Sequence, residues 1–220
     1  MSEIYLQAKA VWTEPTLNDA AAFADLKAEF PGRSARRMTR LGMQLSHVLR
    51  PLEIDSSCSL VYATSYSETC TIEKFLDSFP FPSPQAFQTS IHPGGVEQFL
   101  IQNKIPIDEL FPLAGGDDLL IRALDTVQLC SGRRVILCGG EERGTWLADA
   151  GISAASNYAW ALALQTQPTA QTIGRIWWER LAAAAGDPTL LIDFIRALQS
   201  QSPYHYHAPE GGQLELNWSV

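Results

Sequence analysis

Four cysteines are the first candidates for nucleophilic or metal-binding chemistry in this sequence, and their spacing supports neither role. None of them forms a Cys-x-x-Cys pair, the spacing used by redox centres and zinc sites. Cys58, Cys130 and Cys138 lie in apolar company, where a cysteine is usually a small hydrophobic residue. A Gly-x-Ser-x-Gly nucleophile elbow and a phosphate-binding loop are absent as well. The sequence therefore lacks the common signatures of hydrolases and of phosphate-binding enzymes.

Two acidic residues and two histidines are the remaining candidates for acid–base or metal chemistry. Asp117 and Asp118 follow two glycines and precede a strongly apolar helical stretch. A carboxylate at a helix start is a good N-terminal cap, because it accepts free backbone N–H groups of the first turn. His205 and His207 form a His-x-His pair in an aromatic segment, but no acidic or cysteine ligand is spaced nearby. We therefore expect no metal and no cofactor.

Arginines gather in one short stretch, although the chain as a whole is acidic. The formal net charge is −8, which argues against nucleic acid as the main partner. The clustered residues are Arg33, Arg36, Arg37 and Arg40. They form either a solvated helix face or a docking patch for an acidic protein, because clustered cations attract anionic surfaces.

Hydrophobic periodicity predicts an α/β chain with a mixed, mostly parallel sheet flanked by helices. Strands are expected at residues 4–12, 59–64, 134–138 (running into Gly139 and Gly140), 158–164, 172–178 and 213–219, the last as an edge strand. Helices are expected at residues 17–30, 34–49, 73–79, 94–103, 119–129 and 188–198. Thr16 or Asn18 should cap the first helix and Asp187 the last, and the prolines at 80, 82 and 84 should exclude regular structure.

The length and composition indicate one globular domain. The chain has 220 residues, of which 46% are hydrophobic and 18% charged, and it contains no repeat or long linker. We expect residues 1–220 to form a single domain. The N-terminus lacks the features of a signal peptide, and no apolar run approaches the roughly 18 residues that span a bilayer. A cytoplasmic protein without a membrane span is therefore expected.

Four segments, in order, resemble the N-terminal half of β-ketoacyl synthases, which have the thiolase fold. Residues 35–41 read ARRMTRL, like the family's RRM-D-R helix, and residues 60–69 read LVYATSYSET, in the place of its strand and GTGYGG turn. Residues 84–93 read PQAFQTSIHP, like P-x-x-F-x-x-S-V-H-N, and residues 123–142 follow the pattern AL-x-x-A…G…VLVGG-x-E. The sequence is most similar to the short chain-length-factor-like subunits of bacterial aryl polyene pathways. The resemblance implies the N-terminal half of a thiolase-like fold.

The resemblance also implies that the catalytic residues are missing. In ketosynthases, a cysteine lies where a strand enters a buried helix, and the positive helix end lowers its pKa. Counting back from Ala123 places that position at Asp117, whose carboxylate cannot form the required acyl-thioester. The family's two active-site histidines lie in the C-terminal half of a fold about twice this length, and His205 and His207 lack their sequence context. We therefore expect a pseudo-ketosynthase subunit and not an enzyme.

Such a subunit is expected to pair with a full-length ketosynthase, as a heterodimer or a higher heteromer, and to shape its acyl or polyene tunnel. Thiolase-fold subunits pair through their N-terminal halves, whose sheets join edge to edge. The tunnel or interface candidates are Tyr66, Ala86, Phe87, Ser90 and His92. Tyr66 and Phe87 have an alternative role, which is to fill the core of this subunit alone.

The arginine patch would dock an acyl carrier protein transiently under the same resemblance. Two other functions remain open from the sequence. One is a free-standing module that binds acyl groups or carrier proteins. The other is an enzyme that uses Asp117 or Asp118 as a base.

Overall fold

One sheet organises the part of the chain that a computed structural model describes, which is residues 2–16, 19–132, 134–179, 189–207 and 212–219. Its strand order is β3-β2-β4-β5-β1-β6-β8-β7. The strands are β1 (Ser2–Thr13), β2 (Cys58–Thr64), β3 (Glu109–Ala114), β4 (Arg134–Glu141), β5 (Tyr158–Gln165), β6 (Gly174–Trp178), β7 (Tyr204–His207) and β8 (Gln213–Trp218). The helices are α1 (Ala20–Ala28), α2 (Gly32–Ala35), α3 (Arg40–Leu49), the 3-10 helix η1 (Arg50–Leu52), α4 (Thr69–Leu76), α5 (Pro84–Ser90), α6 (Gly94–Asn103), α7 (Leu119–Val127), α8 (Trp146–Asp149) and α9 (Leu190–Ser200).

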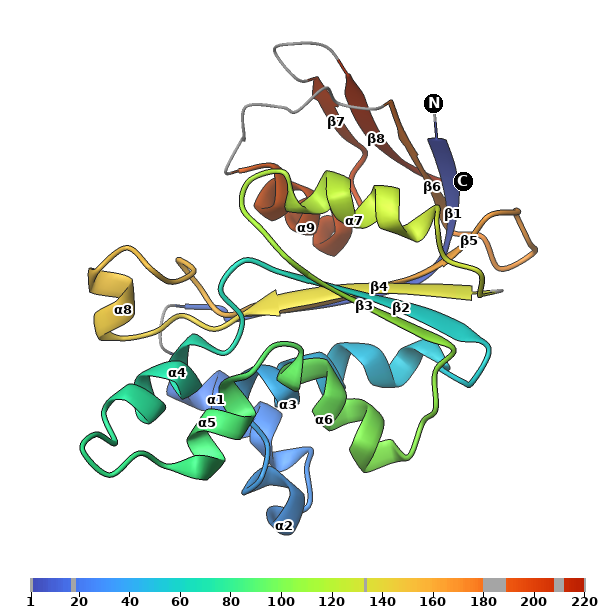
Figure 1. The fold of residues 1–220 in the computed structure, drawn as a ribbon. Coiled ribbons are helices and arrows are strands. Elements are labelled where there is room, and N and C mark those ends of the chain that lie inside the picture. The colour runs from blue at the N-terminus through green and yellow to red at the C-terminus, as the bar shows by residue number, and fades with distance from the viewer. Residues whose placement is uncertain (1, 17–18, 133, 180–188, 208–211, 220) are drawn as a thin grey trace.

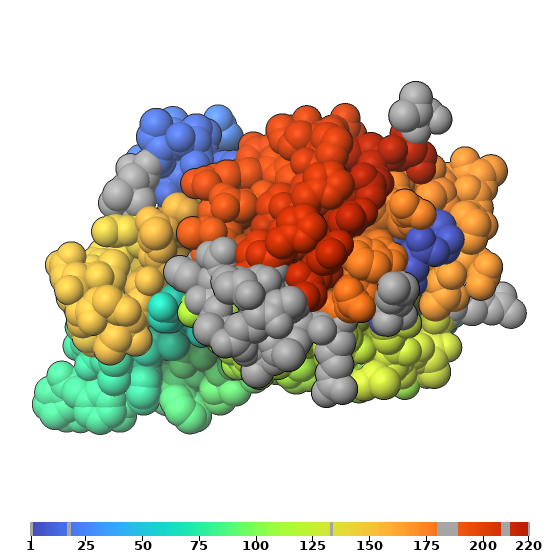
Figure 2. Space-filling view, turned by 90° about the horizontal axis from the view of Figure 1, so that it is seen from above, coloured from blue at the N-terminus to red at the C-terminus, as the bar shows by residue number. Residues whose placement is uncertain are grey.

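The elements lie in layers (Figure 1). Helices α1–α6 lie on one side of the central strands, and α7 and α9 lie on the other. Strands β6, β8 and β7, here called the wing, turn over α7 and α9, so these two helices pack between the wing and the central strands. From above, residues of α9 and the wing form one continuous surface over the middle of the molecule (Figure 2). None of the described helices is long and apolar enough to span a lipid bilayer.

Strand β2 is buried along its whole length, because helices cover both of its faces. Val61 and Ala63 belong to the core that includes α7 and α9. Leu60 and Tyr62 belong to the core on the opposite face, with α3 and α6. A strand that is covered on both sides reads as a continuous apolar run and not as an alternation, which is why this strand was predicted well.

The sheet is mixed as predicted, but it is mostly antiparallel. Only β2–β3 and β2–β4 are parallel pairs among the described strands. The other pairs, β1–β5, β1–β6, β4–β5, β6–β8 and β7–β8, are antiparallel. The strand expected at residues 213–219 is present as β8, but its predicted position at the edge is wrong, because β7 pairs with the outer side of β8 and forms the edge.

Strand β1 joins the wing to the rest of the sheet. Its residues Ser2–Leu6 pair with β6, and residues from Tyr5 to Thr13 pair with β5 on the other side. The register with β5 shifts between Leu6 and Ala8. One long strand thus supplies a hydrogen-bonded neighbour to both parts of the sheet.

Side-chain caps explain why the helices near the N-terminus begin at residues other than those predicted. The helix expected at residues 34–49 is two helices, because Thr39 caps α3 by accepting a hydrogen bond from the Gly42 N–H at 2.9 Å. Helix α1 begins later than expected and is capped by Asp19, which accepts from the Ala22 N–H at 2.9 Å. Thr16 is not the cap; its hydroxyl lies 3.2 Å from the Asp19 carboxylate. Asn18 and the expected cap of the last helix, Asp187, lie outside the described residues.

Two proline-containing segments also differ from expectation. Helix α5 begins at Pro84, and Ser83 caps it. Proline is tolerated in the first turn of a helix, where its missing N–H would have no partner. Strand β3 was not predicted at all; it contains Pro112 and is the end strand of the sheet. An edge strand tolerates proline because one of its sides has no ladder to interrupt.

Candidate functional site

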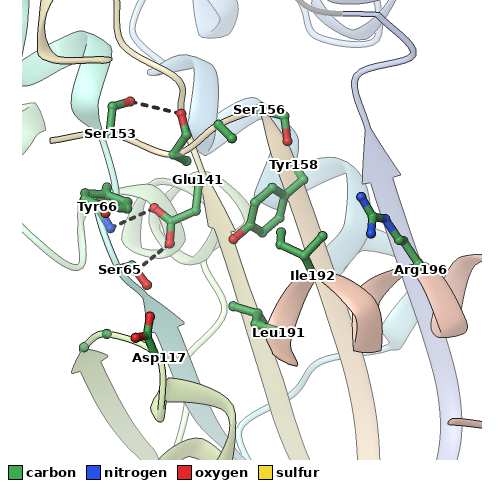
Figure 3. A pocket seen from close by; sticks show the side chains of 14 residues that line it. Ser65, Tyr66, Asp117, Glu141, Ser153, Ser156, Tyr158, Leu191, Ile192 and Arg196 are labelled. Atoms are coloured by element: carbon green, nitrogen blue, oxygen red, sulfur yellow. Dashed lines mark hydrogen bonds between the residues drawn. The ribbon is translucent and has the colours of Figure 1, made fainter. Parts of the chain in front are cut away.

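A cavity of about 590 Å³ opens at the carboxyl ends of β2 and β4. Its walls come from the turn after β2, the turn between β3 and α7, the last residue of β4, the loop before β5 with the first residue of β5, and α9. Figure 3 shows Tyr66 and Asp117 on one side of the cavity, with Tyr158, Ile192 and Arg196 across from them. Apolar and charged side chains therefore face the same space.

Asp117 lies in the turn that carries the chain from β3 into α7, and it lines this cavity. The turn joins a strand to a buried helix, and the assignment of Asp117 to the nucleophile position stays a prediction. The expected cap is not formed: the N-cap of α7 is Asp118, which makes no side-chain capping hydrogen bond. Asp118 instead pairs with Arg122 at 2.9 Å. The carboxylate of Asp117 can hold a proton or a cation but cannot carry an acyl-thioester.

The turn after β2 is held by the buried carboxylate of Glu141. Its Oε1 accepts hydrogen bonds from the Ser65 N–H and from the Thr64 hydroxyl, the latter at 3.0 Å. Its Oε2 accepts from the N–H groups of Tyr66 at 2.9 Å and Ser67 at 2.7 Å. Burial raises the pKa of Glu141, and these four donors oppose the rise because they stabilise the charged form. Ser67 has a φ of 57°, in the left-handed region that favours glycine.

The other predicted tunnel residues lie on or just after α5 and do not line this cavity. Ala86 lines a second hollow, described below. Phe87 is 52% exposed, and its ring centre lies 5.2 Å from that of Phe75. The Ser90 hydroxyl donates to the Phe87 carbonyl at 2.8 Å. His92 stacks on the buried ring of Tyr62 at 5.0 Å, and burial lowers its pKa.

The four clustered arginines separate in the structure. Arg40 pairs with Glu14 at 2.8 Å and lies over the Phe23 ring, so it is engaged within this subunit. Arg36 and Arg37 are exposed and line a hollow of about 320 Å³ together with Lys74. Arg33 is exposed on α2.

Free thiols are present but are poorly suited to nucleophilic attack. Burial raises the pKa of Cys58 and of the fully buried Cys138 above their usual values. It raises the pKa of Cys70 to about 12 and that of Cys130 to about 11. A thiol with such a pKa is almost entirely protonated near neutral pH, and the thiolate is the reactive form.

The histidine pair on β7 points to solvent. His205 and His207 are exposed, and His205 Nδ1 lies 3.8 Å from a carboxylate oxygen of Glu215. No group of three or more histidine, cysteine or carboxylate side chains gathers as a metal site within the described ranges.

Solved structures with the same architecture include chains of ketosynthase complexes. The "Ketosynthase (ApeO) in Complex with its Chain Length Factor (ApeC)" from Xenorhabdus doucetiae matches with a TM-score of 0.69 and 16% identity, over 99% of this chain and 100% of that chain. "The ishigamide ketosynthase/chain length factor" matches with a TM-score of 0.59 and 9% identity, over 100% and 99% of the two chains. The fold is thiolase-like. A β-ketoacyl synthase from Burkholderia phymatum STM815 matches with a TM-score of 0.56 and 11% identity, over 84% of this chain and 65% of that chain.

The thiolase-like fold confirms the architecture that the four sequence motifs implied. No model of a known protein family matches the sequence, and no curated protein matches it. At 16% identity or less, the structural likeness concerns the fold, so the function has to be argued from the residues themselves.

Three buried carboxylates of this thiolase-like chain were not predicted from the sequence: Glu141 lines the cavity, and Glu68 and Glu142 lie behind it in the chain's interior. Glu141 holds the Tyr66 turn, and its neighbour Glu142 accepts from the N–H groups of Leu41 at 2.7 Å and Cys70 at 3.0 Å. Glu68 is fully buried, and burial raises its pKa to about 8. One signal was visible in the sequence: Glu141 and Glu142 directly follow an apolar strand and two glycines, where a charged side chain needs buried partners.

Proposed function

We propose that this chain is a non-catalytic, chain-length-factor-like subunit that pairs with a full-length ketosynthase in the cytoplasm and shapes its acyl tunnel. Aryl polyene or related type II polyketide or fatty-acid-like synthesis is the proposed setting. The observation that carries the proposal is Asp117, a carboxylate at the junction of β3 and the buried helix α7. A ketosynthase needs an acylated cysteine there, and this residue cannot supply one.

The thiols elsewhere in the chain support a non-catalytic role. Cys58 and Cys138 are core residues, and Cys130 packs against the core that includes α7. Their raised pKa values keep them protonated, so they are poor substitutes for the missing nucleophile.

Pairing with a ketosynthase is supported by the comparisons and by the sheet. The chain covers almost the whole of its matched chains in two ketosynthase/chain length factor complexes. Strand β3, which leads directly to Asp117, ends the sheet on one side. An end strand with free backbone groups can pair with the sheet of another chain, so we propose β3 as the pairing edge.

Two side chains are proposed to limit the length of the growing acyl chain. Tyr66 is 41% exposed on the cavity wall, and Phe87 is 52% exposed on α5. Exposure to this extent argues against a role that is confined to filling this subunit's own core. A ring of this size would bound an apolar tunnel by its volume, and Ala86, Ser90 and His92 are proposed to line the same interface.

A carrier protein is proposed to dock transiently at the hollow formed by Arg36, Arg37 and Lys74. Arg40, one of the four arginines in the docking patch expected from the sequence, is left out of this site because it forms an ion pair with Glu14. The same hollow supports a second candidate function, a free-standing carrier-binding module. That alternative predicts carrier binding by the isolated chain without any effect on a synthase.

The test is co-expression with a full-length ketosynthase of the same organism, followed by size-exclusion chromatography and mass analysis of the products. The proposal predicts a stable complex and a product length that increases in Tyr66→Ala and Phe87→Ala. Tyr66→Phe is the matched control, since it keeps the ring volume. Phe79→Ala is the control for Phe87→Ala, because the exposed Phe79 ring also contacts Phe75, with ring centres 5.5 Å apart. Acylation of the isolated chain, or unchanged products in both alanine variants, would refute the proposal.

A further inference from the structure

We propose that Glu141 is a positioning residue that sets product length by fixing the direction of Tyr66. The inference rests on the proposed function, in which the Tyr66 ring bounds the tunnel. The inference assigns the orientation of that ring to the carboxylate of Glu141, which lies at the end of β4 and lines the same cavity.

The hydrogen bonds of Glu141 are concentrated on one short segment. Three successive backbone N–H groups, those of Ser65, Tyr66 and Ser67, donate to its two oxygens. Thr64 completes the set from the end of β2, since its hydroxyl donates to Glu141 and accepts from the Ser67 N–H at 2.8 Å. Successive N–H groups that converge on one anion form a rigid turn, and bonds to a charged acceptor are the stronger kind.

Other contacts hold the end of this turn: the Ser67 carbonyl accepts from the Thr69 N–H at 2.9 Å and from the Glu142 N–H at 3.2 Å. Ser67 adopts a left-handed backbone conformation, which is unfavourable for a residue with a side chain. The Tyr66 side chain is 41% exposed, so the surrounding core does not fix it. The ring lies on the wall of the cavity near Tyr158, and the backbone of Tyr66 sets the direction in which its Cα–Cβ bond leaves the turn. Glu141 is the acceptor that the Ser65 and Tyr66 N–H groups share, so removing its charge should loosen the backbone that carries the Tyr66 ring.

Glu142 provides a matched control within the same chain. It is equally buried and also accepts two backbone N–H bonds, but these come from the first turns of α3 and α4. The backbone N–H of Glu142 donates to the Ser67 carbonyl at 3.2 Å, and Glu142→Gln keeps this bond, so loss of the charge should affect stability without releasing the Tyr66 turn. A comparison of Glu141→Gln with Glu142→Gln thus separates positioning from general destabilisation.

The test uses the complex with the ketosynthase and has two readouts, the product lengths and the hydrogen exchange of residues 65–67. In Glu141→Gln we expect about tenfold faster exchange of these three amides, as for the loss of a charge-assisted bond, and a product shift like that of Tyr66→Ala. The double variant Tyr66→Ala/Glu141→Gln should give no further shift, because both changes act through one ring. Thr64→Val, which keeps the carboxylate, is a milder second variant and should shift the products in the same direction. Glu142→Gln should leave the lengths unchanged.

The outcomes separate this inference from the proposed function. One outcome is a change of product length in Tyr66→Ala but not in Glu141→Gln or Thr64→Val, although the amides of residues 65–67 exchange faster in the latter two variants. This outcome overturns the role of Glu141 and leaves the tunnel role of Tyr66 intact. Unchanged products in Tyr66→Ala overturn both. An additive shift in the double variant, or an equal shift in Glu142→Gln, also overturns the positioning role.

Discussion

Glu68 should make the stability of this protein fall as the pH rises through the neutral range. Its side chain is fully buried, and one of its oxygens, Oε1, has no hydrogen-bond partner among the described residues. Burial is the main cause of its raised pKa, and the nearby carboxylate of Glu142 adds to the rise. The hydroxyl of Ser67, which donates to Glu68, acts in the opposite direction. The folded protein thus keeps a proton on Glu68 at pH values where the unfolded chain has lost it.

The sign and the size of the effect follow from proton linkage. Because the pKa is raised in the folded state, the stability contributed by Glu68 is fully present below pH 4.5 and is lost as the pH rises to about 8. Each pH unit between these values contributes about 1.4 kcal/mol, so the total loss is about 5 kcal/mol. This is comparable to the whole free energy of unfolding of a small domain.

The measurement is urea unfolding of the wild type and Glu68→Gln at several pH values from 5 to 9. The glutamine has the same shape but does not titrate. Its free energy of unfolding, relative to wild type, should therefore increase with pH and level off above about pH 8. Glu97→Gln, an exposed position on α6, is the control and should follow the wild type. Parallel curves for wild type and Glu68→Gln would show that the reasoning about burial is wrong.

Three further predictions concern other parts of the chain. Lys104 ends α6 with a φ of 52°, so Lys104→Gly should raise the free energy of unfolding by about 0.5–1 kcal/mol, as measured by urea unfolding. The control Gln102→Gly lies within the helix and should lower the free energy of unfolding by about 1 kcal/mol in the same assay. Replacing Arg36 and Arg37 by glutamate should weaken carrier-protein binding about tenfold or more, as measured by calorimetry at low salt, and unchanged affinity would exclude the hollow as the docking site. Asp117→Ala should leave the turnover of the reconstituted synthase within about twofold of wild type, and a loss of turnover would reveal a catalytic role for this carboxylate.

Some elements could be predicted from the sequence because a single local signal determines them. Helix α6 has the bounds that were expected, from Gly94 to Asn103, and β2 was expected from its apolar run. The helix after Asp117 was expected from its apolar run, whereas the strand before it, β3, was not. Strand β3 was missed because its half-exposed pattern and Pro112 resemble a loop.

The roles of the buried carboxylates Glu141 and Glu142 could not be predicted in the same way. Glu141 lies far along the sequence from the turn that it holds, and Glu142 caps helices that begin at Arg40 and Thr69. Their roles arise only when β2 and β4 become neighbours in the sheet. The antiparallel majority of the strand pairs is likewise a property of the assembled sheet and not of any strand alone.

The position of β1 gives the first residues of the chain an influence on a distant region. Residues Ser2–Leu6 form the hydrogen-bonded seam between β6 and the other strands, and α9, which packs beneath the wing, supplies one wall of the cavity. Trimming the chain up to Leu6 would leave the wing attached mainly through apolar packing. A shortened N-terminus should therefore loosen the cavity wall at Leu191 and Ile192. An N-terminal fusion tag could disturb the same wall, so ligand binding to the cavity is best measured with the tag at either end.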